Sequence, residues 1–164
     1  MRILGVDPGL VSTGWGVIEL RGSTLSFIAC GTIAPKKDLP LSERLLTLHH
    51  ELTTIIAQHV PTHGALEETF VTANGSSTLK LGQARGALLV TLAAAGLPVS
   101  EYAAKLVKKA IVGTGSADKH QVSQMVGVLL PSARTALAEC RHDAADALAL
   151  AICAANHQSL SYGG

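Results

Sequence analysis

A chain of 164 residues, of which 48% are hydrophobic, is long enough for one compact domain with a substantial core. Its longest apolar stretches are interrupted by glycine, proline or charged residues well short of a membrane span, which argues against a membrane protein. The formal net charge of +1 predicts no partner by itself.

The first half of the chain is predicted to be rich in strands. Apolar runs bounded by turn residues predict strands over residues 2–7, 14–20 and 24–32. A hairpin signal at residues 21–23 favours an antiparallel meander. An amphipathic helix follows, with Ser42 as its predicted N-cap, and residues 65–67 then form a short strand that ends in an acid.

The second half is predicted to be mainly helical. Periodicity and turn residues predict helices over residues 78–95, 103–112, 117–130 and 143–157. A serine within residues 74–77 is the expected N-cap of the first of these helices, and Ser116 that of the third. A fifth strand is expected over residues 98–102. We predict a single domain over residues 1–158, followed by a disordered tail over residues 159–164.

This order of strands and helices predicts an α/β fold with a five-stranded mixed sheet flanked by helices. Ligands of such sheets bind beyond the carboxyl ends of strands. Asp7 and Glu67 both end predicted strands, where an unpaired charge is costly. Glu68 follows Glu67, and strand alternation sends their side chains to opposite faces.

Two more acids begin the last helix. Asp143 and Asp146 are spaced i, i+3, so they share one face of a helix that is otherwise rich in Ala and Leu. For Asp143, a favourable interaction with the helix dipole, of about 0.3–1 kcal/mol, is a sufficient explanation. The dipole explains Asp146 less well, because Asp146 lies further into the apolar part of the helix.

Four acidic side chains gathered in one place require a positive charge that offsets their mutual repulsion. Two like charges about 4 Å apart repel by roughly 4 kcal/mol at an effective dielectric constant near 20. No lysine or arginine lies beside Asp7 or Glu67 in the predicted strands, so a divalent cation is the expected partner. Carboxylates without accompanying His or Cys spacing favour Mg²⁺ over zinc.

The basic residues are concentrated in the middle of the chain. Residues 76–121 carry six basic and two acidic side chains, whereas residues 1–75 carry five basic and seven acidic ones. This asymmetry is compatible with an anionic partner, although a solvated basic face is the commoner explanation. Three cysteines without metal-ligand spacing, Cys30, Cys140 and Cys153, and an N-terminus without a secretory signal predict a cytoplasmic protein with reduced thiols.

Five motifs, GVDPGLVSTGWGV, ALEETF, KLGQARG, YAAKLVKKAIVGTGSADKHQV and DAADALALA, closely resemble in this order the RuvC family of Holliday-junction resolvases. The resemblance extends from about residue 2 to residue 157. It implies a ribonuclease-H-like fold, with Asp7, Glu67, Asp143 and Asp146 as catalytic and metal-binding acids. It also implies a homodimer that nicks four-way DNA junctions symmetrically with Mg²⁺ or Mn²⁺ and cooperates with the RuvA–RuvB branch-migration complex.

The resemblance and the acids together suggest a two-metal mechanism. Two Mg²⁺ ions per subunit, about 3.5–4 Å apart, would activate a water and stabilise the leaving 3′-oxygen, giving 5′-phosphate and 3′-hydroxyl ends. Asp7 is the best candidate to bridge both ions. His142 is either an auxiliary group or simply an exposed residue at the start of the helix.

Further residues are candidates for DNA binding and dimer contact. The expected phosphate contacts are Lys105, Lys108, Lys109 and Lys119. Phe70 is either a core residue or, as the resemblance suggests, a ring that stacks on junction bases. The helix 78–95 is apolar on more than one face, which predicts a two-fold dimer through Leu81, Leu88 and Leu92.

Other functions also fit parts of the sequence. A related nuclease acting on hybrids or RNA, or a non-catalytic DNA-binding module of the same fold, would share many of these features. The Gly-rich N-terminal hairpin is also found in actin-like and sugar-kinase-like ATPases. Those enzymes usually need two such domains, and a chain of 164 residues supplies one.

Overall fold

A mixed β-sheet forms the centre of the molecule, and helices cover both of its faces. The computed structural model describes residues 1–68, 73–140 and 142–162. Within them the elements are β1 (Arg2–Asp7), β2 (Thr13–Arg21), β3 (Thr24–Ile33), α1 (Leu41–His59), β4 (His63–Glu67), α2 (Gly75–Ala94), β5 (Val99–Tyr102), α3 (Ala104–Val112), α4 (Lys119–Leu129), a 3₁₀ turn (Pro131–Ala133), α5 (Arg134–Glu139) and α6 (His142–Tyr162).

The strand order in the sheet is β3-β2-β1-β4-β5. β1 pairs antiparallel with β2, and β2 with β3, which confirms the predicted meander. β4 lies parallel to β1 on its other side, and β5 is parallel to β4. The predicted five-stranded mixed sheet is therefore confirmed, and the parallel half places the carboxyl ends of β1 and β4 next to each other.

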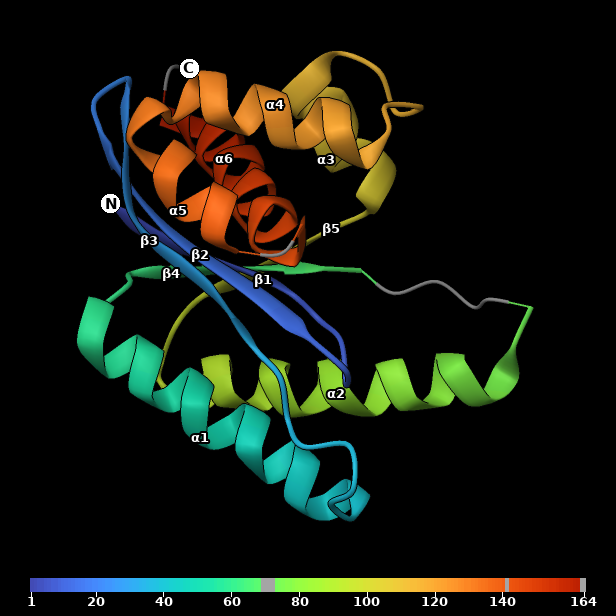
Figure 1. The fold of residues 1–164 in the computed structure, drawn as a ribbon. Coiled ribbons are helices and arrows are strands. Elements are labelled where there is room, and N and C mark those ends of the chain that lie inside the picture. The colour runs from blue at the N-terminus through green and yellow to red at the C-terminus, as the bar shows by residue number, and fades with distance from the viewer. Residues whose placement is uncertain (69–72, 141, 163–164) are drawn as a thin grey trace.

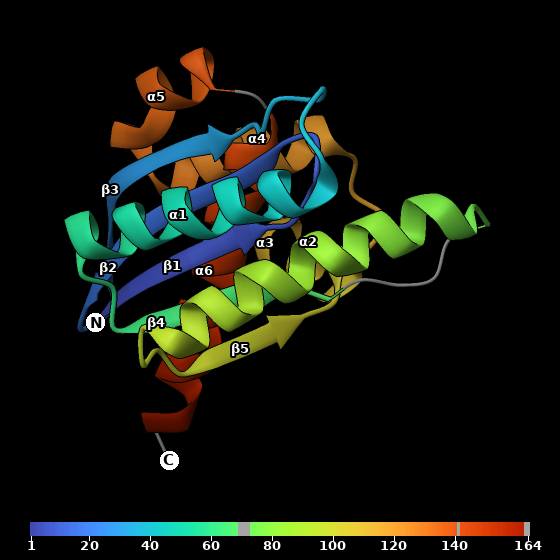
Figure 2. The same cartoon turned by 90° about the horizontal axis from the view of Figure 1, so that it is seen from below.

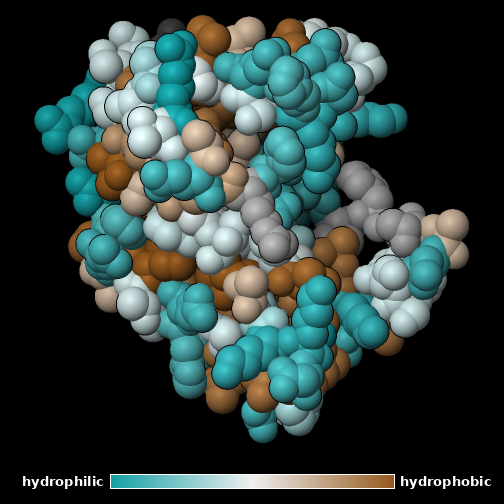
Figure 3. Space-filling model, in the orientation of Figure 1, coloured by the Kyte–Doolittle hydropathy of each residue, from teal (hydrophilic) through white to brown (hydrophobic). Residues whose placement is uncertain are grey.

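Two helical layers enclose the sheet (Figure 1). Helices α1 and α2 lie against one face, and α3, α4, α5 and α6 lie against the other. Viewed from below, α1 and α2 lie in front of the sheet, and α2 runs in nearly the same direction as β1 (Figure 2). Strand alternation divides the core accordingly: Leu4 and Val6 pack in the cluster beneath α1 and α2, whereas Ile3 packs in the cluster beneath α6. In Figure 3 the apolar residues form a band at the level of the sheet between the two layers.

The helix N-termini differ from the serine caps that the sequence predicts. α1 begins at Leu41, after Pro40, and no side chain caps it. The cap of α2 is Asn74, whose side chain accepts a hydrogen bond from the Ser77 N–H. The cap of α4 is Asp118 and not Ser116, because Asp118 and Gln121 exchange two hydrogen bonds in a capping box.

Helix α6 is longer than predicted. It continues to Tyr162, so the backbone of residues 159–162 is helical where the sequence predicts a disordered tail. No proline or glycine interrupts the sequence between Asp143 and Tyr162, and the helix therefore meets no local stop signal. Within the described part of the chain, none of the helices combines the length and the apolar character needed to cross a bilayer.

Two of the predicted dimer contacts on α2 are wrong. Leu88 and Leu92 have no exposed surface and pack in the cluster of this chain's own core beneath α1 and α2. The sequence shows that α2 is apolar on more than one face, but the inward face belongs to the sheet. The outward face carries Leu79 and Val90, which are 63% and 65% exposed, whereas Leu81 is half-buried.

Candidate active site

The ends of two parallel strands bring the first two acids together. Val6 of β1 is in register with Leu66 of β4, so the next residues, Asp7 and Glu67, end adjacent strands. Alternation directs both side chains to the α6 face, and the two carboxyl groups hydrogen-bond. Glu68, by contrast, is exposed, and its N–H continues the pairing with β5 by donating to the Tyr102 carbonyl.

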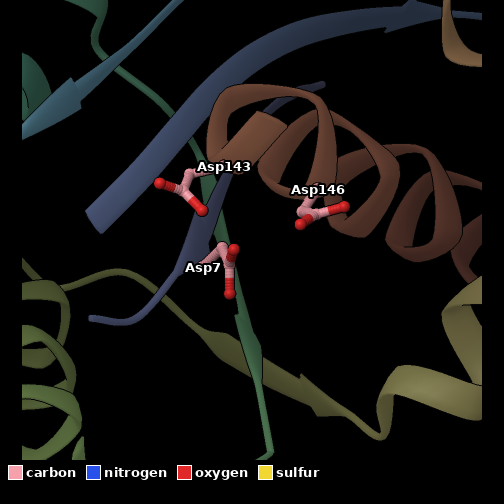
Figure 4. A group of neighbouring side chains, drawn as sticks. All are labelled: Asp7, Asp143 and Asp146. Atoms are coloured by element: carbon pink, nitrogen blue, oxygen red, sulfur yellow. The ribbon is translucent and has the colours of Figure 1, made fainter. Parts of the chain in front are cut away.

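Helix α6 supplies two further acids. Asp143 and Asp146 project from its first turns toward Asp7 (Figure 4). One carboxylate oxygen from each of Asp7, Asp143 and Asp146 lies within 4.8 Å of the other two. The predicted i, i+3 spacing thus places both helix acids over the end of β1.

Glycines allow α6 to come this close to the sheet. Gly5 and Gly16 are paired across β1 and β2, and Gly14 pairs with Asp7. A Cβ atom on Gly5 would overlap the carbonyl of Ala147, one on Gly14 would overlap the carbonyl of Asp143, and one on Gly16 would meet the Leu148 side chain. These glycines are not among the residues predicted for the site, although glycines at alternate strand positions opposite an Ala-rich helix are a usable signal.

Burial and the neighbouring acids raise the pKa of Asp7 and of Asp146. Burial, the hydrogen bond to Glu67 and the charges of Glu67, Asp146 and Asp143 together raise the pKa of Asp7 to about 9. Burial also raises the pKa of Asp146, which the nearby ammonium of Lys119 opposes. Without a cation, the site therefore retains a proton on Asp7 at neutral pH.

A cavity of about 200 Å³ opens beside these acids. Its polar lining comes from Asp7, Glu67, Asp146, Lys108 and Lys119, and its apolar lining from α3, α4 and α6. The donors from the acidic cluster are carboxylate oxygens, which suit a hard cation such as Mg²⁺ or Mn²⁺ better than zinc. The residues present therefore fit a divalent metal site.

The basic residues predicted to bind phosphate divide into two groups. Lys105 and Lys109 are exposed on α3, whereas Lys108 lines the acidic cavity. Lys119, in the first turn of α4, lies with its Nζ 3.8 Å from an Asp146 oxygen while its side chain stays 69% exposed. No local sequence pattern predicts this pairing, because α4 and α6 meet only in the folded chain.

Phe70 and His142 are the remaining residues that the sequence suggests for the site. Phe70 falls outside the described residues. His142 begins α6, and its charge lowers the pKa of Asp146, so it lies close enough to interact with the site.

A five-stranded sheet of this order, with acids at the ends of β1 and β4 and at the start of α6, defines a nuclease domain of the ribonuclease-H-like class. A family model described as crossover junction endodeoxyribonuclease RuvC matches residues 3–154. The chain belongs to the RuvC family of crossover junction endodeoxyribonucleases, enzymes that hydrolyse phosphodiester bonds of DNA.

Individual relatives agree with this family. The chain is 56% identical over 158 residues to the crossover junction endodeoxyribonuclease RuvC of Xanthobacter autotrophicus, covering 96% of this chain and 91% of the relative. Identity to the corresponding protein of Azorhizobium caulinodans is 55% with the same coverage. Among solved structures, Thermus thermophilus RuvC in complex with a Holliday junction substrate superposes with a TM-score of 0.86 at 29% identity, covering 98% of this chain and 96% of that one.

Proposed function

We propose that this resolvase cuts four-way junctions with two Mg²⁺ ions per subunit, held by Asp7, Glu67, Asp143 and Asp146, and that Mn²⁺ can replace Mg²⁺. The observation that carries this proposal is the convergence of oxygens from Asp7, Asp143 and Asp146 to within 4.8 Å of one another. Such a cluster is unfavourable without a cation, as the raised pKa of Asp7 indicates.

Each acid has a distinct place in this proposal. When bound, the metal ions would supply an activated water and stabilise the leaving 3′-oxygen, which would give 5′-phosphate and 3′-hydroxyl ends. Asp7 hydrogen-bonds with Glu67 and lies within 4.8 Å of both α6 acids, which makes it the residue suited to hold both ions. Asp7 must lose its proton for this role, and a bound cation favours that loss.

The lysines are proposed to hold the DNA backbone. Lys108 and Lys119 both line the acidic cavity, so both can reach a phosphate that enters the site. Lys105 and Lys109 extend the positive surface along α3. The solved T. thermophilus relative was captured with a Holliday junction, which supports the same substrate for this chain.

A homodimer supplies two active sites for paired symmetric nicks. The proposed interface is the outward face of α1 and α2, where Leu46, Leu79 and Val90 are exposed. An open cavity of about 480 Å³ lies between these helices and is lined mainly by apolar surface. We propose that a second copy covers this face, and that the dimer works in the cytoplasm in recombination and repair together with the RuvA–RuvB complex.

The test is cleavage of a synthetic mobile four-way junction, with linear duplex and an RNA–DNA hybrid in parallel. Wild-type protein should cut the junction into ligatable duplexes in Mg²⁺ or Mn²⁺ but not in EDTA. Asp7→Asn, prepared identically, is the matched control for a contaminating nuclease. Junction cutting in EDTA would overturn the metal site, and preferential cutting of the hybrid would favour the alternative nuclease function.

A further inference from the structure

The backbone carbonyl at the end of β4 has no donor from the neighbouring strand. The N–H groups of Gly64 and Glu68 point toward the β5 side, where they donate hydrogen bonds to the carbonyl oxygens of Pro98 and Tyr102. By alternation, the Glu67 carbonyl points toward β1, and the parallel register places its expected donor one residue after Asp7. That residue is Pro8, which has no N–H.

Arg85 of α2 supplies the missing donor. Its Nε donates to the Glu67 carbonyl oxygen at 3.1 Å. The same guanidinium forms an ion pair with Glu101 of β5, whose neighbour in β4 is Leu66. The Arg85 side chain is only 19% exposed, so this fork ties α2 to the ends of both β4 and β5 from the face opposite the acidic cavity.

The position of Glu67 depends on this end of the strand. Its side chain leaves the backbone at the last residue of β4, beside Asp7, where the site gathers its acids. The following residues 69–72 lie outside the described part, so the contacts described that anchor this end are the β5 pairing and Arg85. A backbone held at this carbonyl restricts where the Glu67 carboxylate can lie.

We propose that Arg85 is a positioning residue for the metal site: it replaces the ladder donor that Pro8 lacks and so fixes the Glu67 carboxylate beside Asp7. Glu101 in turn holds the Arg85 guanidinium in place. This inference rests on the proposed function, in which Glu67 is a metal ligand. Groups that orient metal ligands typically change metal affinity by about 10–100-fold when removed.

The test measures Mn²⁺ binding by the protein alone, from the loss of the free-ion signal in electron paramagnetic resonance. Arg85→Met should weaken Mn²⁺ binding by about 10–100-fold and raise the Mn²⁺ concentration for half-maximal cleavage by the same factor. Arg85→Lys should show a smaller change, because one ammonium can still donate to the carbonyl but does not reproduce the fork. Glu101→Gln should act in the same direction as Arg85→Met, and Lys80→Met, an exposed cation of the same helix, should leave Mn²⁺ binding unchanged.

The possible results separate three roles for Arg85. Unchanged Mn²⁺ affinity in Arg85→Met together with a lower melting temperature would make Arg85 a purely structural residue and overturn the inference. Unchanged Mn²⁺ affinity with weaker junction binding and a shallower salt dependence would make it a phosphate contact and overturn it too. If Arg85→Met does not fold, Arg85→Lys and Glu101→Gln test the inference in its place. Mn²⁺ affinity equal to that of wild type in both variants would overturn the inference.

The same experiment distinguishes failure of the proposed function from failure of the positioning role of Arg85 alone. Wild-type protein should bind Mn²⁺ more tightly than Asp7→Asn does. Equal binding by these two proteins would remove the metal site itself, and with it the role of Arg85. Tighter binding by wild type, with Arg85→Met indistinguishable from wild type, would leave the metal site intact and overturn only the positioning role.

Discussion

At the scale of single residues, Asp7 has the most unusual environment. It is partly buried, it hydrogen-bonds with Glu67, and it faces the charges of Asp143 and Asp146. These effects raise its pKa from 3.8 to about 9. The folded protein therefore binds this proton more tightly than the unfolded chain does. Its contribution to stability is complete below about pH 4 and is lost as the pH rises toward 9.

The metal-free protein should accordingly become less stable with rising pH. In EDTA, we expect the melting temperature to fall as the pH increases from about 5 to about 9, because Asp7 must ionise beside other carboxylates. Asp7→Asn should show a smaller fall, since the amide does not titrate. Mg²⁺ should restore stability most strongly at the upper end of this range. A melting temperature that rises with pH in the wild type and not in the variant would contradict the raised pKa of Asp7.

Asp7→Asn should abolish cleavage while leaving junction binding intact or improved, because the substitution removes a negative charge that repels phosphate. Gel-shift assays in Ca²⁺ and cleavage assays in Mg²⁺ measure the two properties separately. Cutting at near wild-type rate would be incompatible with a metal site built on Asp7.

The two adjacent glutamates provide a matched pair. Glu67→Gln should lose most cleavage, because Glu67 lies in the acidic cavity beside Asp7. Glu68→Gln should keep it, because Glu68 is exposed and outside the residues that line this cavity. Single-turnover cleavage at saturating Mg²⁺ is the measurement. The reverse pattern would shift the catalytic assignment by one residue.

At the scale of elements, the packing of α6 on β1 and β2 determines how close the α6 acids lie to Asp7. Gly14→Ala would drive a methyl group into the backbone around Asp143, which cannot yield by a side-chain rotation. We expect a loss of about 1–3 kcal/mol in stability and a larger relative loss of cleavage, because the α6 acids move from Asp7. Gly75→Ala, where the methyl group meets nothing within 4 Å, is the control. Denaturant unfolding and cleavage rates together test this prediction. Stability and cleavage equal to wild type in Gly14→Ala would refute the close approach of α6 to β2.

The basic helix α3 should determine how DNA binding responds to salt. Lys108→Ala should weaken junction binding and reduce the log–log salt slope by about one unit, because one phosphate contact is lost. Lys37→Ala, an exposed lysine on the loop before α1, should leave the slope unchanged. Affinity measured over a series of salt concentrations tests this, and an unchanged slope for Lys108→Ala would place that lysine outside the DNA-binding surface.

At the scale of the whole molecule, the proposed homodimer supplies the two active sites that paired nicks need. Val90→Glu places a charge on the exposed face of α2, and should give a folded monomer that produces open circles and not linear DNA from a cruciform plasmid. Val128→Glu, at a similarly exposed position on α4, should remain dimeric. Sedimentation measures the oligomeric state, and a dimeric Val90→Glu protein that still linearises the plasmid would place the interface elsewhere.

Leu88 tests the correction to the predicted interface. Leu88→Ala should lower stability by about 2–5 kcal/mol, because the side chain is fully buried within its own subunit. The dissociation constant of the dimer should change little, apart from the effect of unfolding. A large change in dimer affinity without loss of monomer stability would contradict the buried position of Leu88.

The amino-acid sequence by itself predicts the five strands, their meander and the acids at the strand ends. Strand and helix periodicities are local properties, and alternation alone sends Glu67 and Glu68 to opposite faces. The spacing of Asp143 and Asp146 likewise defines their common face before any packing is known. Motif resemblance gives the family, which the comparisons confirm.

Only the tertiary structure decides which faces and ends meet. A sequence shows that α2 is apolar on two sides, but the placement of the sheet decides that Leu88 and Leu92 lie inside and Val90 outside. The contacts of Lys119 with Asp146 and of Arg85 with Glu67 join residues from different elements, so no local pattern contains them. Their partners are selected by the packing of helical layers on the sheet, which depends on contacts between distant parts of the chain.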